Sequence, residues 1–260
     1  MTTAVLDRRW VTLFAELFLI VAGILIALYI DGWVQDRQDR SREKAYLELL
    51  RDDLELIETE LAEYIEFEES IVATGKAFLD AIVTTDQIAG QRSLQGMLSE
   101  MSVRRTLNVE SAAYTDLTRT GNLRLIRDAT LRRQLVRYFA GVERSELIAE
   151  KNSKQYVDEV FVRYLLNAGV TINIDQSVLA TVTGTNEVLL DTLGPQFEWP
   201  RDVILRQPRN ASSWDDLRRQ VLFRMRIAAA GTVIGERMIQ STQQMRADIE
   251  KELERRDSAP

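Results

Sequence analysis

The sequence contains one uninterrupted apolar stretch, VTLFAELFLIVAGILIALYI, which runs from Val11 to Ile30 and includes a single charged residue, Glu16. A helix of these twenty residues is about 30 Å long at a rise of about 1.5 Å per residue, which matches the hydrocarbon core of a bilayer. Its thirteen Val, Leu, Ile and Phe residues favour insertion by about 4 to 8 kcal/mol, whereas one acidic residue opposes it by at most about 3.5 kcal/mol. The stretch therefore predicts a transmembrane helix.

Aromatic residues stand at both ends of the stretch. Trp10 precedes it, Tyr29 lies near its far end and Trp33 follows it, as expected of side chains that anchor a span in the two headgroup layers. A cleaved secretory signal has an apolar region of about 7 to 15 residues followed by a cleavage site of small residues. Here the stretch is longer and continues into Asp31, Gly32 and Trp33, which favours an uncleaved anchor.

Four residues of the stretch recur at helical spacing and predict a packing face for the transmembrane helix: Glu16, Ile20, Gly23 and Ala27. Gly23 and Ala27 form a pair of small residues four positions apart, which lets two helix backbones approach closely. Glu16 shares this face, and intramembrane acids usually face protein or water rather than lipid. The face could pair with another helix. Alternatively, Glu16 is only tolerated and its side chain extends toward the membrane interface.

Composition limits the chemistry that this chain can carry out. The sequence contains no cysteine and no histidine, so it offers no thiolate nucleophile, no imidazole base and no Cys- or His-based metal site. It also has no phosphate-binding glycine loop and no nucleophile elbow. Adjacent acids such as Asp52-Asp53 and Asp215-Asp216 point apart on a helix and make weak catalytic or metal sites. We expect no enzyme activity, no catalytic residue, no metal and no cofactor.

The residues after the span repeat a heptad pattern that predicts a long helix with one apolar seam. The pattern continues from Leu47 to Ile82 with Glu68 and Gly75 as its only breaks. Between Ser41 and Val83 there are twelve acids and four bases, so the outer face of this helix is acidic. Its seam residues are Leu47, Leu50, Leu54, Ile57, Leu61, Tyr64, Ile71, Phe78 and Ile82.

The middle of the chain predicts shorter helices joined by tight turns. Leu94, Met97, Leu98 and Met101 give one short helix its apolar side. A second helix with Tyr114 and Leu117 is expected to end at Gly121, and Asp128 to cap the next one. That helix uses Leu131, Leu135, Tyr138 and Val142 and continues to Gly169.

The last third of the chain predicts an irregular insertion and a second long helix. Glycines and prolines cluster within residues 171–211, leaving room for a short β-hairpin, and we expect Trp199 to cover one end of the bundle rather than to line a ligand groove. Ser212 and Ser213 open a helix of about 40 residues, whose apolar side carries Leu217, Val221, Ile227, Ile234, Met238, Met245, Ile249 and Leu253.

The predicted fold is all-α. A transmembrane helix continues into a long helix of an elongated antiparallel helical bundle, with a small irregular or β-hairpin insertion. We divide the chain into an N-terminal flank at residues 1–10, the transmembrane helix at 11–34, one helical extramembrane domain at 35–256 and a tail at 257–260.

A net charge of −7 and a pI near 5.0 disfavour a nucleic-acid partner. The middle of the chain is nevertheless basic, and we expect its arginines to match the acidic helix within the chain or between subunits. These residues are Arg104, Arg105, Arg119, Arg124, Arg127, Arg132, Arg133 and Arg137.

Two segments resemble a family of uncharacterised bacterial single-span membrane proteins: AELFLIVAGILIALYIDGWVQDRQ followed by AYLELLRDDLELIETEL, and AAYTDLTRTGNLRLIRDATLRRQLVRYF. The matching positions are Glu16, Gly23 to Leu28, Trp33, Tyr114, Leu117 and Gly121. The chain departs from the family at Tyr29 and Asp31-Gly32, where the family more often has Gln and paired Asn. The resemblance implies a bacterial membrane protein with a helical domain and no known activity.

The sequence leaves the orientation of the span and the function of the domain open. Arg8 and Arg9 directly precede the span, whereas more basic residues follow it from Arg37 onward; the nearest charges favour a periplasmic domain and the wider count a cytoplasmic one. Our leading hypothesis is a membrane-anchored interaction protein, a scaffold or accessory subunit, with the lipid bilayer and either a homo-oligomer or a membrane-protein partner. The alternative is a single-span sensor whose bundle binds a small ligand or ion.

Overall fold

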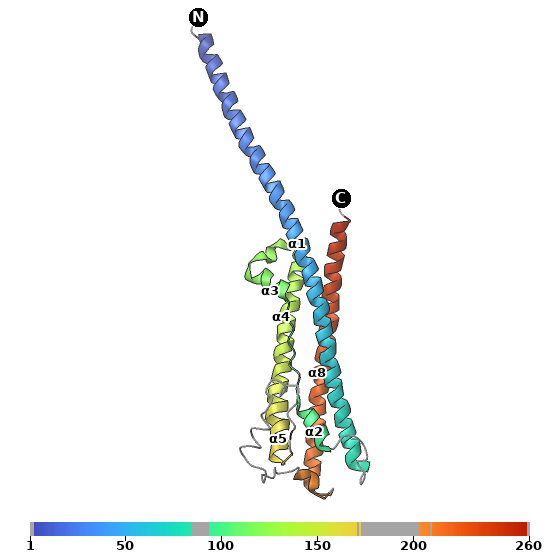
Figure 1. Cartoon of the computed structure of the whole chain (residues 1–260). Helices are drawn as coiled ribbons and strands as arrows, with labels where there is room; N and C mark the ends of the chain where they lie inside the picture. The colour runs from blue at the N-terminus through green and yellow to red at the C-terminus, as the bar shows by residue number, and fades with distance from the viewer. Residues whose placement is uncertain (1–2, 85–93, 171, 173–202, 209, 259–260) are drawn as a thin grey trace, which may run out of the picture. The chain divides into compact units, whose positions relative to one another are not determined.

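The chain is described by a computed structural model (Figure 1). It covers residues 3–84, 94–170, 172, 203–208 and 210–258, and for residues 3–15, 84 and 257 it describes the backbone alone. Every regular element in these residues is helical, which confirms the all-α prediction. Contacts divide the chain into two compact units. We call residues 1–52, 111–133 and 248–260 the neck unit, and residues 53–110 and 134–247 the bundle unit.

The first helix, α1, runs without interruption from Thr3 to Thr84. It therefore contains both the apolar stretch and the heptad seam, as the sequence predicted. Every predicted seam residue from Leu47 to Ile82 is buried, most of them completely. Burial of a leucine or isoleucine side chain favours folding by about 1.5 to 3 kcal/mol, so this seam is a major source of stability in both units.

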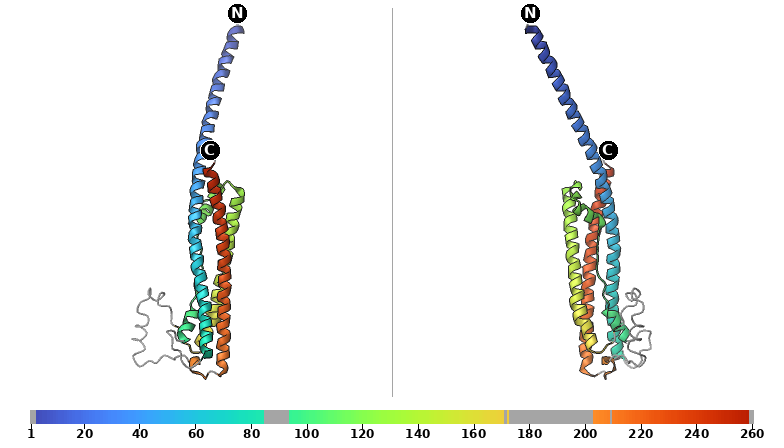
Figure 2. Two further views of the ribbon diagram at one scale, coloured as in Figure 1. Left: turned by 90° about the vertical axis from the view of Figure 1, so that its right-hand side faces the viewer. Right: turned by 60° about the vertical axis from the view of Figure 1, so that its left-hand side comes forward.

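In the bundle unit, α1 runs beside two further helical segments (Figures 1 and 2). One consists of α4 (Ala129–Asn152), a π-helical stretch η2 (Ser153–Val162) and α5 (Arg163–Asn167). The other is α8 (Ser212–Asp257), antiparallel to α1. The short α2 (Leu94–Ser102) adds the apolar side that its sequence predicted, with Leu94, Met97, Leu98 and Met101 all buried. Trp214, which the sequence analysis missed, is fully buried in the same core.

The seam of α8 differs in part from its prediction. Ile227 and Ile234 are only half-buried, whereas the smaller residues Ala228, Gly231 and Gly235 are buried. The reason is steric: a Cβ atom on Gly235 would lie 2.6 Å from Cγ1 of Ile65, closer than real Cβ contacts. Small residues on α8 therefore let α1 approach closely in the bundle unit. The prediction chose the large apolar residues Ile227 and Ile234, each of which lies one position before the residue that is buried.

In the neck unit, a helical hairpin follows residue 110. It consists of α3 (Ala112–Arg119), the 3₁₀ turn η1 (Asn122–Leu125) and the beginning of α4. Gly121 has φ of +70°, so the left-handed turn predicted at the end of α3 is confirmed. Asp128 also acts as predicted, since its Oδ1 accepts hydrogen bonds from the backbone N–H groups of Thr130 and Leu131 at 2.7 Å and 3.0 Å. These bonds hold the pKa of Asp128 below its ordinary value.

Most of the predicted insertion at residues 171–211, including Trp199 and the expected β-hairpin, lies outside the described residues. The described part contains the 3₁₀ turn η3 (Ile204–Arg206) and leads into α8 at Ser212, where the sequence placed the start of the last helix.

Candidate functional site

The apolar part of α1 is long and apolar enough to cross a membrane, by length and composition. None of this apolar window is buried by the rest of the described chain. Exposed apolar surfaces of this extent are typical of membrane or protein interaction sites.

The four predicted packing residues stand exposed on one side of this helix. Glu16, Ile20, Gly23 and Ala27 are exposed, and a Cβ atom built on Gly23 would meet nothing within 4 Å. The face is thus free for another helix.

Among the predicted interface anchors, Tyr29 and Trp33 are exposed, while the side chain of Trp10 lies outside the described residues. The guanidinium carbon of Arg37 lies 5.8 Å from the centre of the Trp33 ring, a cation–π arrangement. It places a basic side chain against Trp33, just beyond the apolar stretch.

A buried carboxylate, Glu43, ties the neck unit together. Its side chain is 0% exposed and accepts hydrogen bonds from both terminal nitrogens of Arg256 at 2.7 Å and 2.6 Å. It also accepts a 2.5 Å bond from the backbone N–H of Arg127. Such bidentate, charge-assisted bonds are about twice as strong as neutral ones. One side chain of α1 therefore holds both the segment before α4 and the last turns of α8.

Arg127 makes a second connection in the neck unit, close to the end of the apolar stretch. Its Nη2 donates to the backbone oxygen of Asp36 at 3.2 Å and to Oδ1 at 2.5 Å. This hydrogen bond is the main cause that holds the pKa of Asp36 below its ordinary value. The phenol of Tyr46 donates to Asp116 in α3 at 2.5 Å. Together these contacts hold the hairpin to the part of α1 that follows the apolar stretch.

The bundle unit contains a second buried ion pair. The side chains of Arg224 in α8 and Glu68 in α1 are 1% and 6% exposed, with Nη1 and Oε2 3.6 Å apart. Neither of these two atoms has a hydrogen-bond partner within the described residues. Arg224 also donates from Nε to Met101 O at 2.9 Å and from Nη2 to Val103 O at 3.2 Å. It thereby supplies donors to carbonyls at the end of α2.

Burial controls the charges at this pair. Loss of solvent raises the pKa of Glu68 and lowers that of Arg224, while the attraction between the two groups opposes both shifts. The neighbouring phenol of Tyr64 has its pKa raised to about 12, chiefly by burial and then by Glu68. A buried pair without a direct short hydrogen bond is a costly arrangement that the rest of the core must support.

The two buried acids, Glu43 and Glu68, both stand at seam positions of α1, but the sequence analysis named only Glu68, as a break in the seam. Glu68 and Gly75 stand where the heptad seam of α1 breaks, and Glu43 lies four residues before its first member, Leu47. All three are seam positions that face the protein interior. At Gly75, a Cβ atom would lie 2.4 Å from Cγ of Met225, so this break makes room for a side chain of α8. A charged residue at a seam position predicts a buried partner, although it does not identify that partner.

Part of the predicted electrostatic match lies inside the chain. In the bundle unit, Arg105 forms an ion pair with Glu63 of the acidic helix at 2.5 Å, and Arg104 with Asp158 at 3.1 Å. With the ion pair between Arg127 and Glu43 at 3.5 Å in the neck unit, the match to the acidic helix within the chain is confirmed for Arg105 and Arg127, whereas the partner of Arg104 lies in η2.

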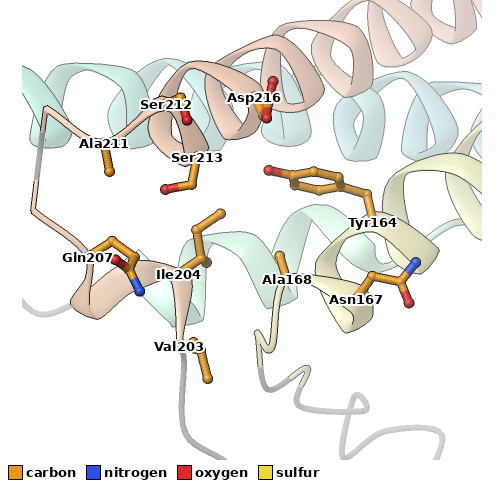
Figure 3. Close-up of a pocket in the computed structure, with 10 residues that line it drawn as sticks. All are labelled: Tyr164, Asn167, Ala168, Val203, Ile204, Gln207, Ala211, Ser212, Ser213 and Asp216. Atoms are coloured by element: carbon orange, nitrogen blue, oxygen red, sulfur yellow. The ribbon is translucent and has the colours of Figure 1, made fainter.

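One pocket in the bundle unit has a volume of about 510 Å³ and lies where α8 begins (Figure 3). Tyr164 and Asn167 line one side of it, and Ser213 and Asp216 another. The Oγ of Ser213 is buried and has no hydrogen-bond partner within the described residues. Among the described residues that line the pocket there is one acid, Asp216, and no lysine or arginine, so this part of the lining is better suited to neutral or cationic groups than to anions.

In the part of the chain that the structure describes, no cluster of three or more acidic side chains is arranged to hold a metal ion. Comparison of the chain with family models, with curated proteins and with solved structures finds no match. The resemblance to bacterial single-span membrane proteins therefore stays a prediction.

Proposed function

We propose that this protein is a membrane-anchored helical interaction protein, a scaffold or accessory subunit that assembles with copies of itself or with another membrane protein. The observation that carries the proposal is the uncovered face of the apolar helix. Glu16, Gly23 and Ala27 are exposed there, and a carboxylate in an apolar layer calls for a polar partner. The helix that bears this face also supplies the buried seam of the folded units, so the partner would be attached directly to the folded part.

Replacing Glu16 by leucine is expected to lower the yield of the protein complex recovered in mild detergent, because a group on the partner then loses its hydrogen-bonding or charged contact. Glu16→Gln keeps hydrogen bonding and should have a milder effect. Gly23→Ile should weaken the same complex, since a large side chain separates the two backbones. The measurement is the mass and amount of the complex by size-exclusion chromatography with light scattering.

Leu17→Ile, one position off the packing face, is the matched control and should leave the complex intact. A complex of unchanged size and amount in Glu16→Leu would contradict a paired Glu16 and leave the span as an anchor alone. All variants should remain in the membrane fraction after alkaline carbonate washing, because none of them makes the stretch less apolar overall.

For localisation we propose the bacterial inner membrane, with one span and a periplasmic domain, on the basis of Arg8 and Arg9 directly before the apolar stretch. A reporter enzyme that is active only in the cytoplasm, fused after Pro260, is expected to be inactive. Its activity would establish the alternative orientation, in which the domain is cytoplasmic.

The pocket at the start of α8 favours a second candidate function, a single-span sensor. A volume of about 510 Å³ lies in the range of small-molecule sites, which is about 300 to 1,000 Å³. The hydroxyl of Ser213 has no hydrogen-bond partner within the described residues, so it could form one with a ligand. A ligand-dependent rise in the melting temperature that Ser213→Ala weakens would separate this function from the first.

A further inference from the structure

The neck unit exposes four arginines that form no ion pair within the described residues, which we call the arginine group. Arg37 lies in α1, Arg119 ends α3, Arg124 lies in η1 and Arg133 lies in the first turns of α4. All four side chains are exposed. Arg37 contacts the Trp33 ring and Arg133 donates to the hydroxyl of Thr130 at 3.4 Å; within the described residues none of the four forms an ion pair.

The hairpin that carries three of these arginines is attached to α1 close to the end of the span. Arg127 of the hairpin binds Asp36 and Glu43 of α1. These residues lie about 5 Å and about 15 Å beyond Trp33 along the helix axis, at a rise of about 1.5 Å per residue. The headgroup layer extends about 5 to 7 Å beyond the hydrocarbon core, and charges act over a further Debye length of about 8 Å. The points at which the hairpin is attached to α1 therefore lie within electrostatic range of a membrane surface at the end of the apolar stretch.

Four acids of the neck unit are already engaged by other groups. Asp36 is paired with Arg127 and Arg40, Glu43 with Arg256, Asp116 with the Tyr46 phenol, and Asp128 caps α4. Asp31 in α1 is exposed. Residues 111–133 contain five arginines and two acids, Asp116 and Asp128, so this segment carries a net charge of +3.

We propose that the arginine group binds the headgroups of anionic phospholipids in the membrane that holds the span. This inference rests on the proposed membrane anchor. A guanidinium matches the geometry of a phosphate with two parallel N–H donors, and each arginine near an anionic membrane surface raises affinity about five-fold. The lipid surface would hold the hairpin at the membrane through charges that the folded chain does not use itself.

The test uses the full-length chain in mild detergent, incubated with phosphatidylglycerol or phosphatidylcholine, with bound lipids counted by native mass spectrometry. The wild-type chain is expected to prefer phosphatidylglycerol by at least about ten-fold. The double variant Arg119→Glu/Arg124→Glu should lose this preference, and Arg119→Gln/Arg124→Gln should reduce it. The matched control is Arg163→Glu/Arg226→Glu, which makes the same charge change at two exposed positions of the bundle unit and should keep the preference.

Equal binding of the two lipids by the wild-type chain would overturn the inference, as would an unchanged preference in Arg119→Glu/Arg124→Glu. Circular dichroism shows whether Arg119→Glu/Arg124→Glu is still folded. If it is not, the lipid preference of Arg119→Gln/Arg124→Gln is the test, and an unchanged preference in that variant would overturn the inference. Carbonate washing of cell membranes separates the two proposals. Release of the wild-type chain by carbonate would contradict the anchor and the lipid site together, whereas an anchored chain without lipid preference would contradict the lipid site alone.

Discussion

Replacing Arg224 by methionine is expected to lower the free energy of unfolding by about 3 to 5 kcal/mol, the usual cost of removing one partner of a buried ion pair. The guanidinium is 1% exposed and faces Glu68, so the variant leaves a buried carboxylate without its counter-charge. It also removes the donors to the carbonyls of Met101 and Val103, which cost about 1 to 3 kcal/mol each when buried and unpaired. Thermal unfolding of the full chain in mild detergent, followed by circular dichroism, measures the loss.

The double variant Glu68→Leu/Arg224→Met isolates the charge contribution. Removal of both charges should recover about 2 to 3 kcal/mol relative to the sum of the single variants, while the two carbonyls stay unpaired. Arg219→Met is the control, because the Arg219 side chain is 70% exposed and its loss should change stability by less than about 0.5 kcal/mol. Additive effects of the two single variants would show that Glu68 and Arg224 do not stabilise one another.

Acidification gives a further check on this pair. Burial raises the pKa of Glu68 above its ordinary value, so in the folded chain this carboxyl binds its proton at a higher pH than in the unfolded chain. Binding of this proton therefore favours the folded chain. This contribution is complete at pH values below the pKa that Glu68 has in the unfolded chain, and it is lost as the pH rises through the higher pKa of the folded chain. In Arg224→Met the remaining charge on Glu68 is the main defect, and protonation removes it. The cost of Arg224→Met should accordingly be smaller at acidic pH than at pH 8.

The heptad pattern was sufficient to predict the helices because burial of large apolar side chains decides their placement. Leu47, Leu54 and Leu61 were assigned to the seam of α1 from spacing alone, and all three are fully buried. The same rule failed in α8, where Ile227 and Ile234 were preferred to Ala228 and Gly231. Close approach of two helices selects small residues at the contact, and hydrophobicity scales give such residues little weight.

The partners of the buried acids could not be predicted from the sequence. Glu68 and Arg224 are separated by more than half of the chain. Arg224 does stand at a seam position of α8, three residues after Val221 and four before Ala228, but this spacing does not say which acid it meets. Register between α1 and α8 decides which arginine meets which acid. That register follows from the sum of the contacts along both helices, and it became visible only with the structure.

Replacing Glu43 by leucine is expected to loosen the neck unit while leaving the bundle unit folded. Glu43 is the common acceptor for Arg256 and for the backbone N–H of Arg127. Its removal leaves a guanidinium that is 19% exposed without this partner, and a backbone donor without an acceptor. We expect a local loss of about 2 to 4 kcal/mol.

Hydrogen exchange with mass spectrometry on the full-length chain in detergent measures this local loss. Faster exchange is expected in residues 111–133 and 248–258, because both segments are held to α1 through Glu43, whereas α2 should exchange as in the wild-type chain. Glu43→Gln keeps one acceptor oxygen and should show a smaller effect. Glu254→Leu removes an exposed acid two residues before Arg256 and serves as the control for charge. Equal acceleration in Glu43→Leu and Glu254→Leu would mean that net charge, rather than the buried clamp, stabilises the neck unit, and acceleration spread into α2 would mean that the two units open together.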